Sequence, residues 1–290
     1  MASLNPIFTA PAPVPPRPKL TPEQENLVQE LHALVPTLLE ELDITDSDSH
    51  KRLLAWATPS CCRRYLAATS WRNIRSAADR LKATLQWRFE YKPDQINSAD
   101  IEPEARSGRS FLSGFDKHGH PLLFLVPSRP RAADTTHPRQ IAFSVFMLER
   151  AIAAMPENSE RIVLVIDYKD VARANATPLS VSLNYLNIFS AHYPETLALG
   201  IMVKPSWYLS VLLTMLGPFL DPVTKAKINF YDPDKGVKPS TNAGTGGWIN
   251  ILDVVDPSQL PVKYGGTFDF EYNHDVYWPQ LLALKPAVSA

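Results

Sequence analysis

The sequence predicts an α/β protein in which an all-helical N-terminal module is followed by a domain with a mainly parallel β-sheet. Three observations support this prediction. Apolar side chains recur at helical spacing through roughly the first hundred residues. Later in the chain, short apolar runs that favour strands alternate with helical segments, which indicates a parallel sheet with helical crossovers. The chain has 290 residues, 45% of them hydrophobic, which is enough for one large α/β domain with a helical appendage.

The first twenty residues differ from the rest of the helical half. Residues 1–20 contain six prolines and few side chains that could be buried, so we expect a disordered or polyproline arm. Structure is expected to begin at Thr21, because Thr21, Pro22 and Gln24 have the spacing of a capping box. Further helices are predicted at about residues 50–57, 60–68 and 74–91. We assign residues 21–105 to the helical module.

The second part of the chain, residues 106–272, is predicted to be the sheet domain. A hairpin over 109–126 has glycine in its turn, and the unbroken run Ile162 to Ile166 is typical of a strand buried on both faces. Further strands are predicted at 197–203 and 227–231, with helices at about 139–154, 179–190 and 205–216. Residues 235–247 are expected to form a flexible surface loop, and 273–290 a short helix and tail.

One segment of the sheet domain needs a functional explanation. Between Lys204 and Asp221 lie sixteen consecutive uncharged residues, in a chain that is 20% charged. We expect a helix that begins near Pro205, is capped by Ser206 and ends at Gly217, which is too short to span a bilayer. Its polar members make one narrow stripe, so the helix is either enclosed by protein or lies against apolar material that is not protein.

Composition excludes several classes of protein. The net charge of −1 argues against a nucleic-acid-binding protein. Cys61 and Cys62 are adjacent, so we expect no disulfide framework and a reducing compartment. No signal peptide, membrane span or lipidation motif is visible, and the nucleophile-elbow, Walker A and dinucleotide-binding patterns are missing from the sequence. We therefore expect a cytoplasmic protein that contacts membranes only peripherally.

Few residues suggest catalysis. His192 and Glu195 are three apart, but Pro194 interrupts that spacing and no second ligand pair accompanies them, so a metal site is not indicated. Asp167 follows the most buried strand, where α/β proteins place groups that handle ligands. The alternative from these residues is a lipid hydrolase or lyase that uses Asp167, His192 and Glu195.

Several motifs resemble the CRAL-TRIO lipid-binding family. Their residues occur in the family's order: Arg64-Tyr65-Leu66 with 81–88, Ala191-His192-Tyr193-Pro194-Glu195, Lys204-Pro205, 218–227 and 260–266. Within the family, the segments 146–150, 167–170 and 272–279 resemble fungal phosphatidylinositol transfer proteins of the pleiotropic-drug-resistance branch. The resemblance covers residues 21–284 and implies a CRAL-TRIO domain whose sheet is the floor of an apolar lipid cavity.

The resemblance gives the uncharged helix a role as a mobile gate over that cavity. Two acyl chains carry about thirty methylenes, and exposing them to water would cost on the order of 25 kcal/mol, so a carrier must enclose them. The hinges implied are Pro205 and Gly217. The expected gate residues are Trp207, Leu209, Val211, Leu212, Leu213, Met215 and Leu216. The expected cavity lining is Ile162, Leu164, Ile166, Leu199 and Ile201.

For the lipid headgroup, the resemblance implies Glu195, Lys227 and Thr224 as contacts. A lysine offers a cation to the phosphodiester, and a glutamate accepts hydrogen bonds from inositol hydroxyls. The chain departs from better-known members where it has Ala67 and Thr69 in place of two arginines. Thr69 could donate a hydrogen bond to the phosphate, without a charge.

The implied function is binding and transfer of phosphatidylinositol without catalysis, metal or cofactor. Ile162 and Leu164 stand where members that carry phosphatidylcholine have hydroxyl residues, so we expect poor phosphatidylcholine binding and no haem ligation. The identity of the second ligand stays open, and the resemblance is compatible with a sterol or another apolar molecule. The resemblance further implies a monomer when loaded with lipid, transient association with intracellular membranes or lipid droplets, and phosphoinositide kinases as partners.

Overall fold

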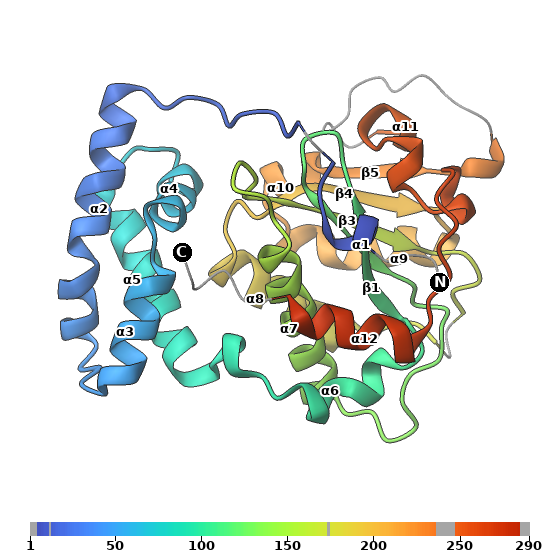
Figure 1. Ribbon diagram of the computed structural model, residues 1–290, viewed down its shortest axis with the longest axis horizontal. Helices are drawn as coiled ribbons and strands as arrows, with labels where there is room; N and C mark the ends of the chain where they lie inside the picture. Colours follow the sequence, from blue (N-terminus) through green and yellow to red (C-terminus); the bar gives the residue numbers. More distant parts are fainter. Residues whose placement is uncertain (1–4, 12, 173–174, 236–246, 285–290) are drawn as a thin grey trace.

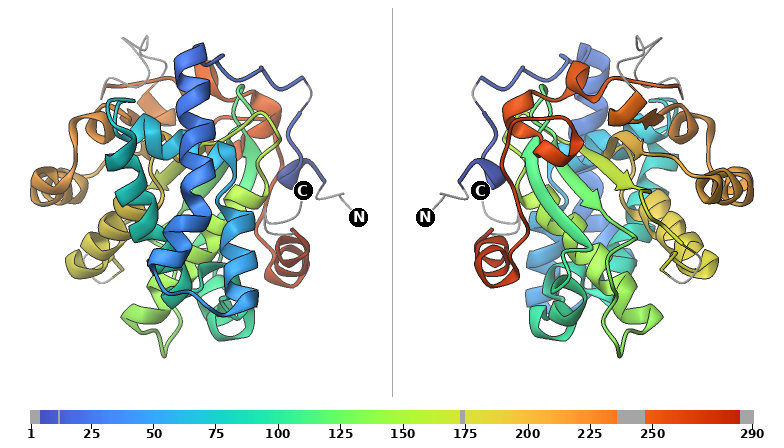
Figure 2. Two further views of the ribbon diagram at one scale, coloured as in Figure 1. Left: turned by 90° about the vertical axis from the view of Figure 1, so that its left-hand side faces the viewer. Right: turned by 90° about the vertical axis from the view of Figure 1, so that its right-hand side faces the viewer.

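The structure is a computed structural model that describes residues 5–11, 13–172, 175–235 and 247–284 (Figure 1). It confirms the predicted fold class. Helices α2 (Pro22–Glu41), α3 (Ser47–Trp56), α4 (Pro59–Ala68) and α5 (Ile74–Tyr91) stand as a bundle beside the sheet domain (Figures 1 and 2). The expected capping box is present, since the Thr21 hydroxyl accepts from the Gln24 amide at 3.3 Å while the Gln24 side chain accepts from the Thr21 amide at 3.0 Å.

The sheet has five strands in the order β1-β2-β3-β4-β5. These are β1 (Ser110–Phe115), β2 (Pro121–Leu125), β3 (Ile162–Asp167), β4 (Leu197–Val203) and β5 (Ile228–Tyr231). β1 and β2 form the expected antiparallel hairpin, and the remaining pairs are parallel. Sequential neighbours in a parallel sheet require crossovers, which are supplied by α7 (His137–Ala153), α8 (Leu179–His192) and the α9–α10 segment, α9 (Trp207–Leu216) and α10 (Pro222–Ala226).

The two faces of the sheet are covered by different parts of the chain. On one face Phe124 stacks on Tyr264 at a centroid distance of 5.0 Å, so this face is covered by the segment that follows β5. That segment contains α11 (Ile251–Val254) and leads to α12 (His274–Ala283). On the other face, Met202 and Tyr168 form a buried cluster with Leu209 of α9. The uncharged helix therefore covers the face opposite to the C-terminal segment.

The proline-rich arm differs from the free chain that its composition predicts. It carries α1 (Asn5–Phe8), whose Ile7 is buried in the main core, and the Phe8 ring lies 5.5 Å from the ring of Tyr277. Arg17 donates to Ser60 at 2.7 Å and contacts Glu160 at 2.5 Å, so the arm joins the helical module to the sheet domain. Composition missed this because the arm depends on a few side chains whose partners are distant in sequence. The predicted loop at 235–247 falls almost entirely on residues outside those described.

A buried ion pair holds the helical module against the sheet domain. Arg88 of α5 is 1% exposed, and its guanidinium contacts the Glu149 carboxylate of α7 at 2.7 Å. The Tyr193 hydroxyl donates to the same carboxylate at 2.6 Å, and the Arg88 guanidinium lies over the Trp56 ring at 4.4 Å. α6 (Ser98–Ala105) continues the chain from α5 toward β1. The Arg88–Glu149 ion pair and its contacts therefore connect α3, α5 and α7 with Tyr193, which belongs to the same motif as Glu195.

We expect Arg88→Met to lower the free energy of unfolding by about 3–5 kcal/mol, because it leaves the Glu149 carboxylate buried without its cation. Denaturant unfolding would measure the loss. The control is Arg106→Met, which breaks an exposed pair with Glu102 at 2.8 Å and should cost less than about 1 kcal/mol. Equal losses of unfolding free energy in the two variants would show that the buried Arg88 pair stabilises the protein no more than an exposed pair does.

Candidate functional site

Glu195 and Lys227, predicted to act together, lie side by side in the structure. The Lys227 ammonium is 3.5 Å from Glu195 Oε2, and the Arg161 guanidinium is 3.3 Å from the same oxygen. Arg161, Glu195 and Lys227 precede β3, β4 and β5 respectively. Because these strands are adjacent and parallel, the residues before them meet at one edge of the sheet. The topology thus assembles an acid and two cations from three separate segments.

The backbone at this edge is held in a conformation that costs energy. Glu195 has a φ of 56°, in the left-handed region that costs a non-glycine residue about 1–2 kcal/mol. Trp71, which lines the pocket described next, has a φ of 59°. Such conformations persist only where surrounding contacts fix them, and they concentrate at functional sites.

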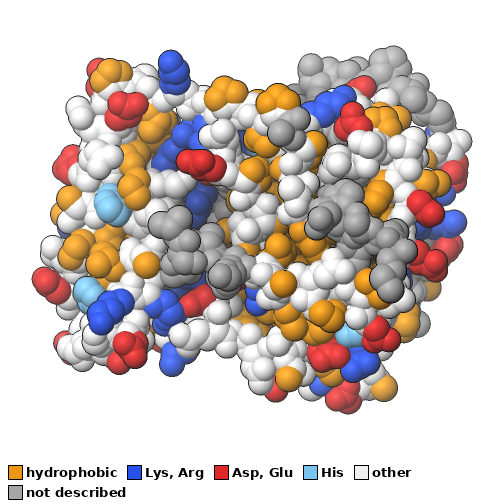
Figure 3. All heavy atoms as spheres, viewed as in Figure 1, with side chains coloured by type: hydrophobic (Ala, Val, Ile, Leu, Met, Phe, Trp, Pro, Cys, Tyr) orange, Lys and Arg blue, Asp and Glu red, His pale blue; other side chains and the backbone are white. Residues whose placement is uncertain are grey.

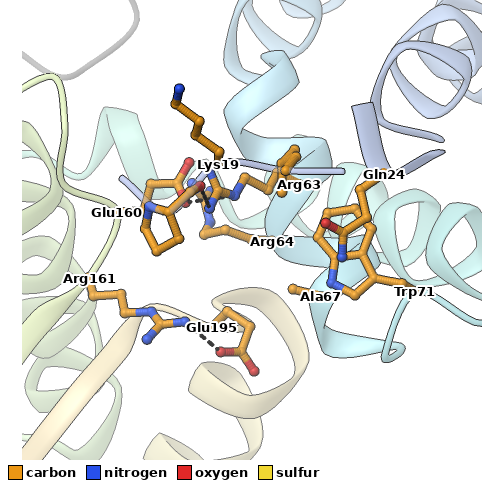
Figure 4. Close-up of a pocket in the computed structure, with 11 residues that line it drawn as sticks. Lys19, Gln24, Arg63, Arg64, Ala67, Trp71, Glu160, Arg161 and Glu195 are labelled. Carbon is orange, nitrogen blue, oxygen red and sulfur yellow. Dashed lines mark hydrogen bonds and ion pairs between the residues drawn. The ribbon is translucent and has the colours of Figure 1, made fainter. Parts of the chain in front are cut away.

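A polar pocket of about 260 Å³ adjoins Glu195 (Figure 4). Its wall comes from four parts of the chain. These are Pro18 to Leu20 of the arm, Gln24 of α2, the α4 region with Arg63, Arg64, Ala67 and Trp71, and the sheet edge with Glu160, Arg161 and Glu195. In Figure 4 the side chains of Arg161 and Glu195 point toward one another across the sheet side of the pocket. In the space-filling view, Lys and Arg side chains gather along the seam between the helical module and the sheet domain (Figure 3).

The pocket carries more positive than negative charge. Arg63 lies 3.7 Å from Glu160, which Arg17 also contacts, and Arg161 is paired with Glu195. Arg64 has no ion pair within the described residues, and its Nε is buried without a hydrogen-bond partner there. An unpaired guanidinium in a partly enclosed space favours an anion, above all a phosphate, which matches its fork of donors.

Sequence reasoning missed Arg161 and assigned Arg64 only to a family motif. Arg161 gave no signal, because only the pairing of β3 with β4 brings it to Glu195. Lys227 and the two threonines expected at the headgroup are not among the residues that line the pocket, although Lys227 contacts Glu195 from just before the neighbouring strand. The Thr69 hydroxyl donates to the Leu66 carbonyl at 3.0 Å, and the Thr224 hydroxyl donates to Asp221 at 2.6 Å as part of the α10 cap. Ala67, one of the two departures from the family pattern, does line the pocket.

The helix expected to be a gate, α9, has one buried side and one exposed apolar side. Leu209 and Leu216 are buried, whereas Leu212 and Leu213 are partly buried against the cluster on the sheet. Trp207 is 75% exposed and Val211 is 40% exposed, and Met215 continues this line at the same spacing of four. Two further exposed apolar residues follow the helix, Phe219 and Val223.

The ends of α9 differ in detail from the prediction. Ser206 occupies the N-cap position, but its hydroxyl makes no capping bond. Gly217 has a right-handed φ of −49° and begins a 3-10 turn, Gly217–Phe219, so the helical path continues for three residues beyond the expected end. The chain becomes extended only at Leu220. The roles of Pro205 and Gly217 as hinges stay predictions.

The predicted cavity lining is divided between the two faces of the sheet. Val163 pairs with Leu199 and Val165 with Ile201, so Leu199 and Ile201 share a face with those valines. Leu164 and Ile166 point to the opposite face, where Ile166 packs against the cluster that contains Leu209 of α9. Ile162 lies on that face by the alternation of the strand, but its side chain belongs to the main core. Leu199 and Ile201 therefore cannot line a cavity beneath α9, and Met202 takes that place. A strand apolar on both faces has no alternation in its sequence that would show which side is which.

The three residues of the hydrolase alternative do not come together. Asp167 ends β3 and is paired with Lys263 at 2.6 Å, whereas Glu195 lies at the opposite end of the same strand pair. A strand of this length separates the two carboxylates by roughly 17 Å. His192 Nδ1 lies 3.2 Å from the Thr84 hydroxyl, and its ring stacks on Trp87 at 4.3 Å. Within the described residues no group of three or more His, Cys, Asp or Glu side chains could hold a metal ion.

Comparison with known proteins finds a matching family model and several similar proteins. The model of the CRAL/TRIO domain matches residues 105–266. The chain is 32% identical, over 91% of its length, to a CRAL-TRIO domain-containing protein of Schizosaccharomyces pombe, of which it covers 25%. It is 31% identical, over 78% of its length, to the phosphatidylinositol transfer protein PDR17 of Saccharomyces cerevisiae, of which it covers 63%.

A third relative and a solved structure also match this chain. The phosphatidylinositol transfer protein CSR1 of Eremothecium gossypii is 26% identical over 89% of this chain, and 57% of it is covered. The chain therefore spans less than two thirds of the length of these curated relatives. The crystal structure of Sfh5 matches with a TM-score of 0.57 over 91% of this chain and 98% of that chain, at 14% identity, which is a similarity of fold.

The environment of His192 generates a pH prediction. Burial, with the nearby Arg88 charge, lowers the pKa of His192 from 6.5 to about 4. The folded protein therefore keeps this ring neutral while the unfolded chain protonates it, so stability should fall as pH decreases from 6.5 toward 4. We expect a contribution of about 1–2 kcal/mol between pH 7 and pH 4.5, because the ring is only partly buried. Unfolding curves for the wild type and His192→Gln would measure it, and an unchanged pH slope in the variant would contradict it.

Proposed function

We propose that this chain, which belongs to the CRAL/TRIO family, binds one phosphatidylinositol molecule and exchanges it at membrane surfaces. The observation that carries the proposal is the polar pocket at the sheet edge, where Glu195 lies between Arg161 and Lys227 and Arg64 has no ion pair among the described residues. Two relatives, PDR17 and CSR1, are phosphatidylinositol transfer proteins. The dispersal of Asp167, His192 and Glu195 gives a hydrolase no support.

The headgroup chemistry follows from the charges in the pocket. A phosphodiester carries one negative charge, for which Arg64 in the pocket wall and Lys227 beside Glu195 are suitable partners. The Glu195 carboxylate, which contacts Arg161 and Lys227, offers oxygens that accept hydrogen bonds from inositol hydroxyls. Thr224 and Thr69 contact the headgroup only if a bound lipid draws their hydroxyls away from Asp221 and the α4 carbonyls.

The acyl chains would lie beneath α9. Its buried side already packs on Ile166 and Met202, which are apolar side chains suited to acyl contacts, and its exposed side offers Trp207, Val211 and Met215 to a bilayer. Opening of α9 at the membrane would exchange one apolar environment for another and expose little hydrocarbon to water. Within the described residues no helix is both long and apolar enough to cross a membrane, so this contact is proposed as peripheral.

The finer points of the proposal rest on the family pattern. Ile162 and Leu164 offer no hydroxyl to a choline lipid, which supports weak phosphatidylcholine binding, and an apolar second ligand such as a sterol fits their character. Cys61 and Cys62 are buried free thiols, and burial raises the pKa of Cys62 to about 12, which fits a reducing, cytoplasmic setting. We further propose transient action at intracellular membranes or lipid droplets, in a form that is monomeric when loaded and supplies phosphoinositide kinases.

The headgroup site is tested by transfer of labelled phosphatidylinositol between vesicles. We expect Glu195→Ala with Lys227→Ala to slow transfer at least tenfold, because the pocket loses an acceptor for inositol hydroxyls and the adjacent ammonium that would donate to the phosphate is removed. The matched control removes an acid–base pair of the helical module that is far from the pocket, Glu41→Ala with Lys82→Ala, whose charged atoms lie 2.7 Å apart. Transfer by the first double variant at the wild-type rate would show that the headgroup lies elsewhere.

The gate helix is tested by one charge on its exposed side. Val211→Glu should slow transfer at least tenfold, because a charge placed in the bilayer costs about 2–3 kcal/mol, while the unfolding midpoint changes little. The control is Val276→Glu, since Val276 is 48% exposed on the helix α12, away from α9. If the two variants slow transfer equally, or if Val211→Glu loses stability in proportion to its activity, α9 is an ordinary packed helix.

A further inference from the structure

A second pocket lies at the other end of the sheet from Glu195. It measures about 70 Å³ and is enclosed by the start of β1, the end of β2, α7 and α8. Its charged members include Arg109 and Arg131, and its apolar wall includes Leu125 and Phe143. The β1 residue Ser110 pairs with Leu125, which in turn pairs with Ile166 near the carboxyl end of β3. The headgroup pocket lies before the amino end of β3, roughly 15 Å away along the strand.

The two arginines face each other without a carboxylate between them. Arg109 donates to the carbonyls of Arg129 and Asn175 at 2.6 and 2.9 Å, and Arg131 donates to the same Asn175 carbonyl at 3.1 Å. Neither guanidinium has an ion pair within the described residues. Burial and the Arg131 charge lower the pKa of Arg109 to about 10, in contrast to Arg139, whose pKa is raised by hydrogen bonds to Asp134 and Glu104.

Glu104 also lines the pocket, but its carboxylate is already bonded to other side chains. One of its oxygens accepts from the Thr135 hydroxyl at 2.6 Å and from Arg139 at 2.9 Å. Arg139 is paired in addition with Asp134 at 2.7 Å. Glu104, Asp134 and Arg139 together carry one net negative charge, so with Arg109 and Arg131 the cluster keeps one net positive charge.

An independent observation is a buried hydroxyl at the same place. Ser110 lines the pocket and is 6% exposed, and its Oγ has no hydrogen-bond partner within the described residues. The Nε of Arg131 is likewise buried without a partner. Buried polar atoms of this kind are uncommon in folded proteins, and two at one pocket beside uncompensated positive charge indicate a missing acceptor.

We infer that this pocket is a second ligand site, which binds the carboxylate of a fatty acid. A carboxylate is small enough for the space and accepts bonds from two guanidinium groups and a hydroxyl at once. The apolar wall at Leu125 is continuous, through its pair Ile166, with the cluster beneath α9, so the acyl tail lies along the face of the sheet that the gate helix covers. A lipid phosphate monoester shares the anionic chemistry and is separated from the carboxylate by the test. The inference does not depend on phosphatidylinositol binding at Glu195.

The test is the binding of cis-parinaric acid to the full-length chain, followed by its fluorescence and compared with its methyl ester. We expect the acid to bind at least tenfold more tightly than the ester, and Arg131→Gln to bring the two affinities within about threefold. Arg106→Gln, at an exposed arginine on the neighbouring helix end, is the control and should leave the ratio unchanged. Equal affinity for acid and ester in the wild type would overturn the inference.

A second pair of variants keeps the test decisive if Arg131→Gln fails to fold. Ser110→Ala removes a hydroxyl that has no hydrogen-bond partner in the described part of the chain, and should weaken acid binding threefold or more without changing ester binding. Ser113→Ala, at another buried serine of β1 whose hydroxyl lacks a partner and which does not line the pocket, should change neither. Identical behaviour of the two serine variants would refute the site. Displacement by oleoyl lysophosphatidate at lower concentration than by oleate would refute the carboxylate assignment in favour of a phosphate.

Discussion

The buried pair between Arg88 and Glu149 is the contact on which the arrangement of the whole molecule depends. A charge taken out of water is tolerated only when its partner is fixed, so α5 and α7 cannot shift relative to one another without a large loss of free energy. Tyr193 shares the Glu149 carboxylate, and Glu195 follows two residues later. The same contact that joins the two modules thus sets the position of the acid at the polar pocket. That pocket lies in the seam between the modules, so it exists only while they are held together.

The sheet separates polar from apolar chemistry along its length. Charged groups gather where strands begin, at Arg161, Glu195 and Lys227, and again beside the far end of β2, at Arg109 and Arg131. Between these ends the face beneath α9 is apolar. An amphiphilic ligand needs this division, because its head must be paired with charge while its tail must be kept from water. A parallel sheet provides this division, because its loops lie at the ends of the strands and the middles of the strands are buried in the core.

The proline-rich arm takes part in the headgroup pocket as an outer wall. Its residues from Pro18 to Leu20 line the space, and Arg17 bridges Ser60 of the helical module and Glu160 of the sheet domain. The arm is extended and contributes few buried side chains, so its attachment depends on Ile7 and Arg17 rather than on a continuous packed surface. A segment whose composition resembles a free tail therefore lines this pocket.

The sequence alone determined the fold class, the order of the elements and the family, because helical spacing, β-branched runs and ordered motifs are local properties. It also predicted that Glu195 and Lys227 act together, through the resemblance rather than through physics. Tertiary structure decided the rest. Strand register placed Leu199 and Ile201 on the face away from α9, which no pattern in a doubly buried strand could reveal. The same pairing brought Arg161 to Glu195, and packing of the two modules turned Arg64 and the arm toward the pocket. Contacts between segments far apart in the chain depend on many weak packing interactions added together. The pattern of a single sequence does not show how these interactions add up, so it does not predict those contacts.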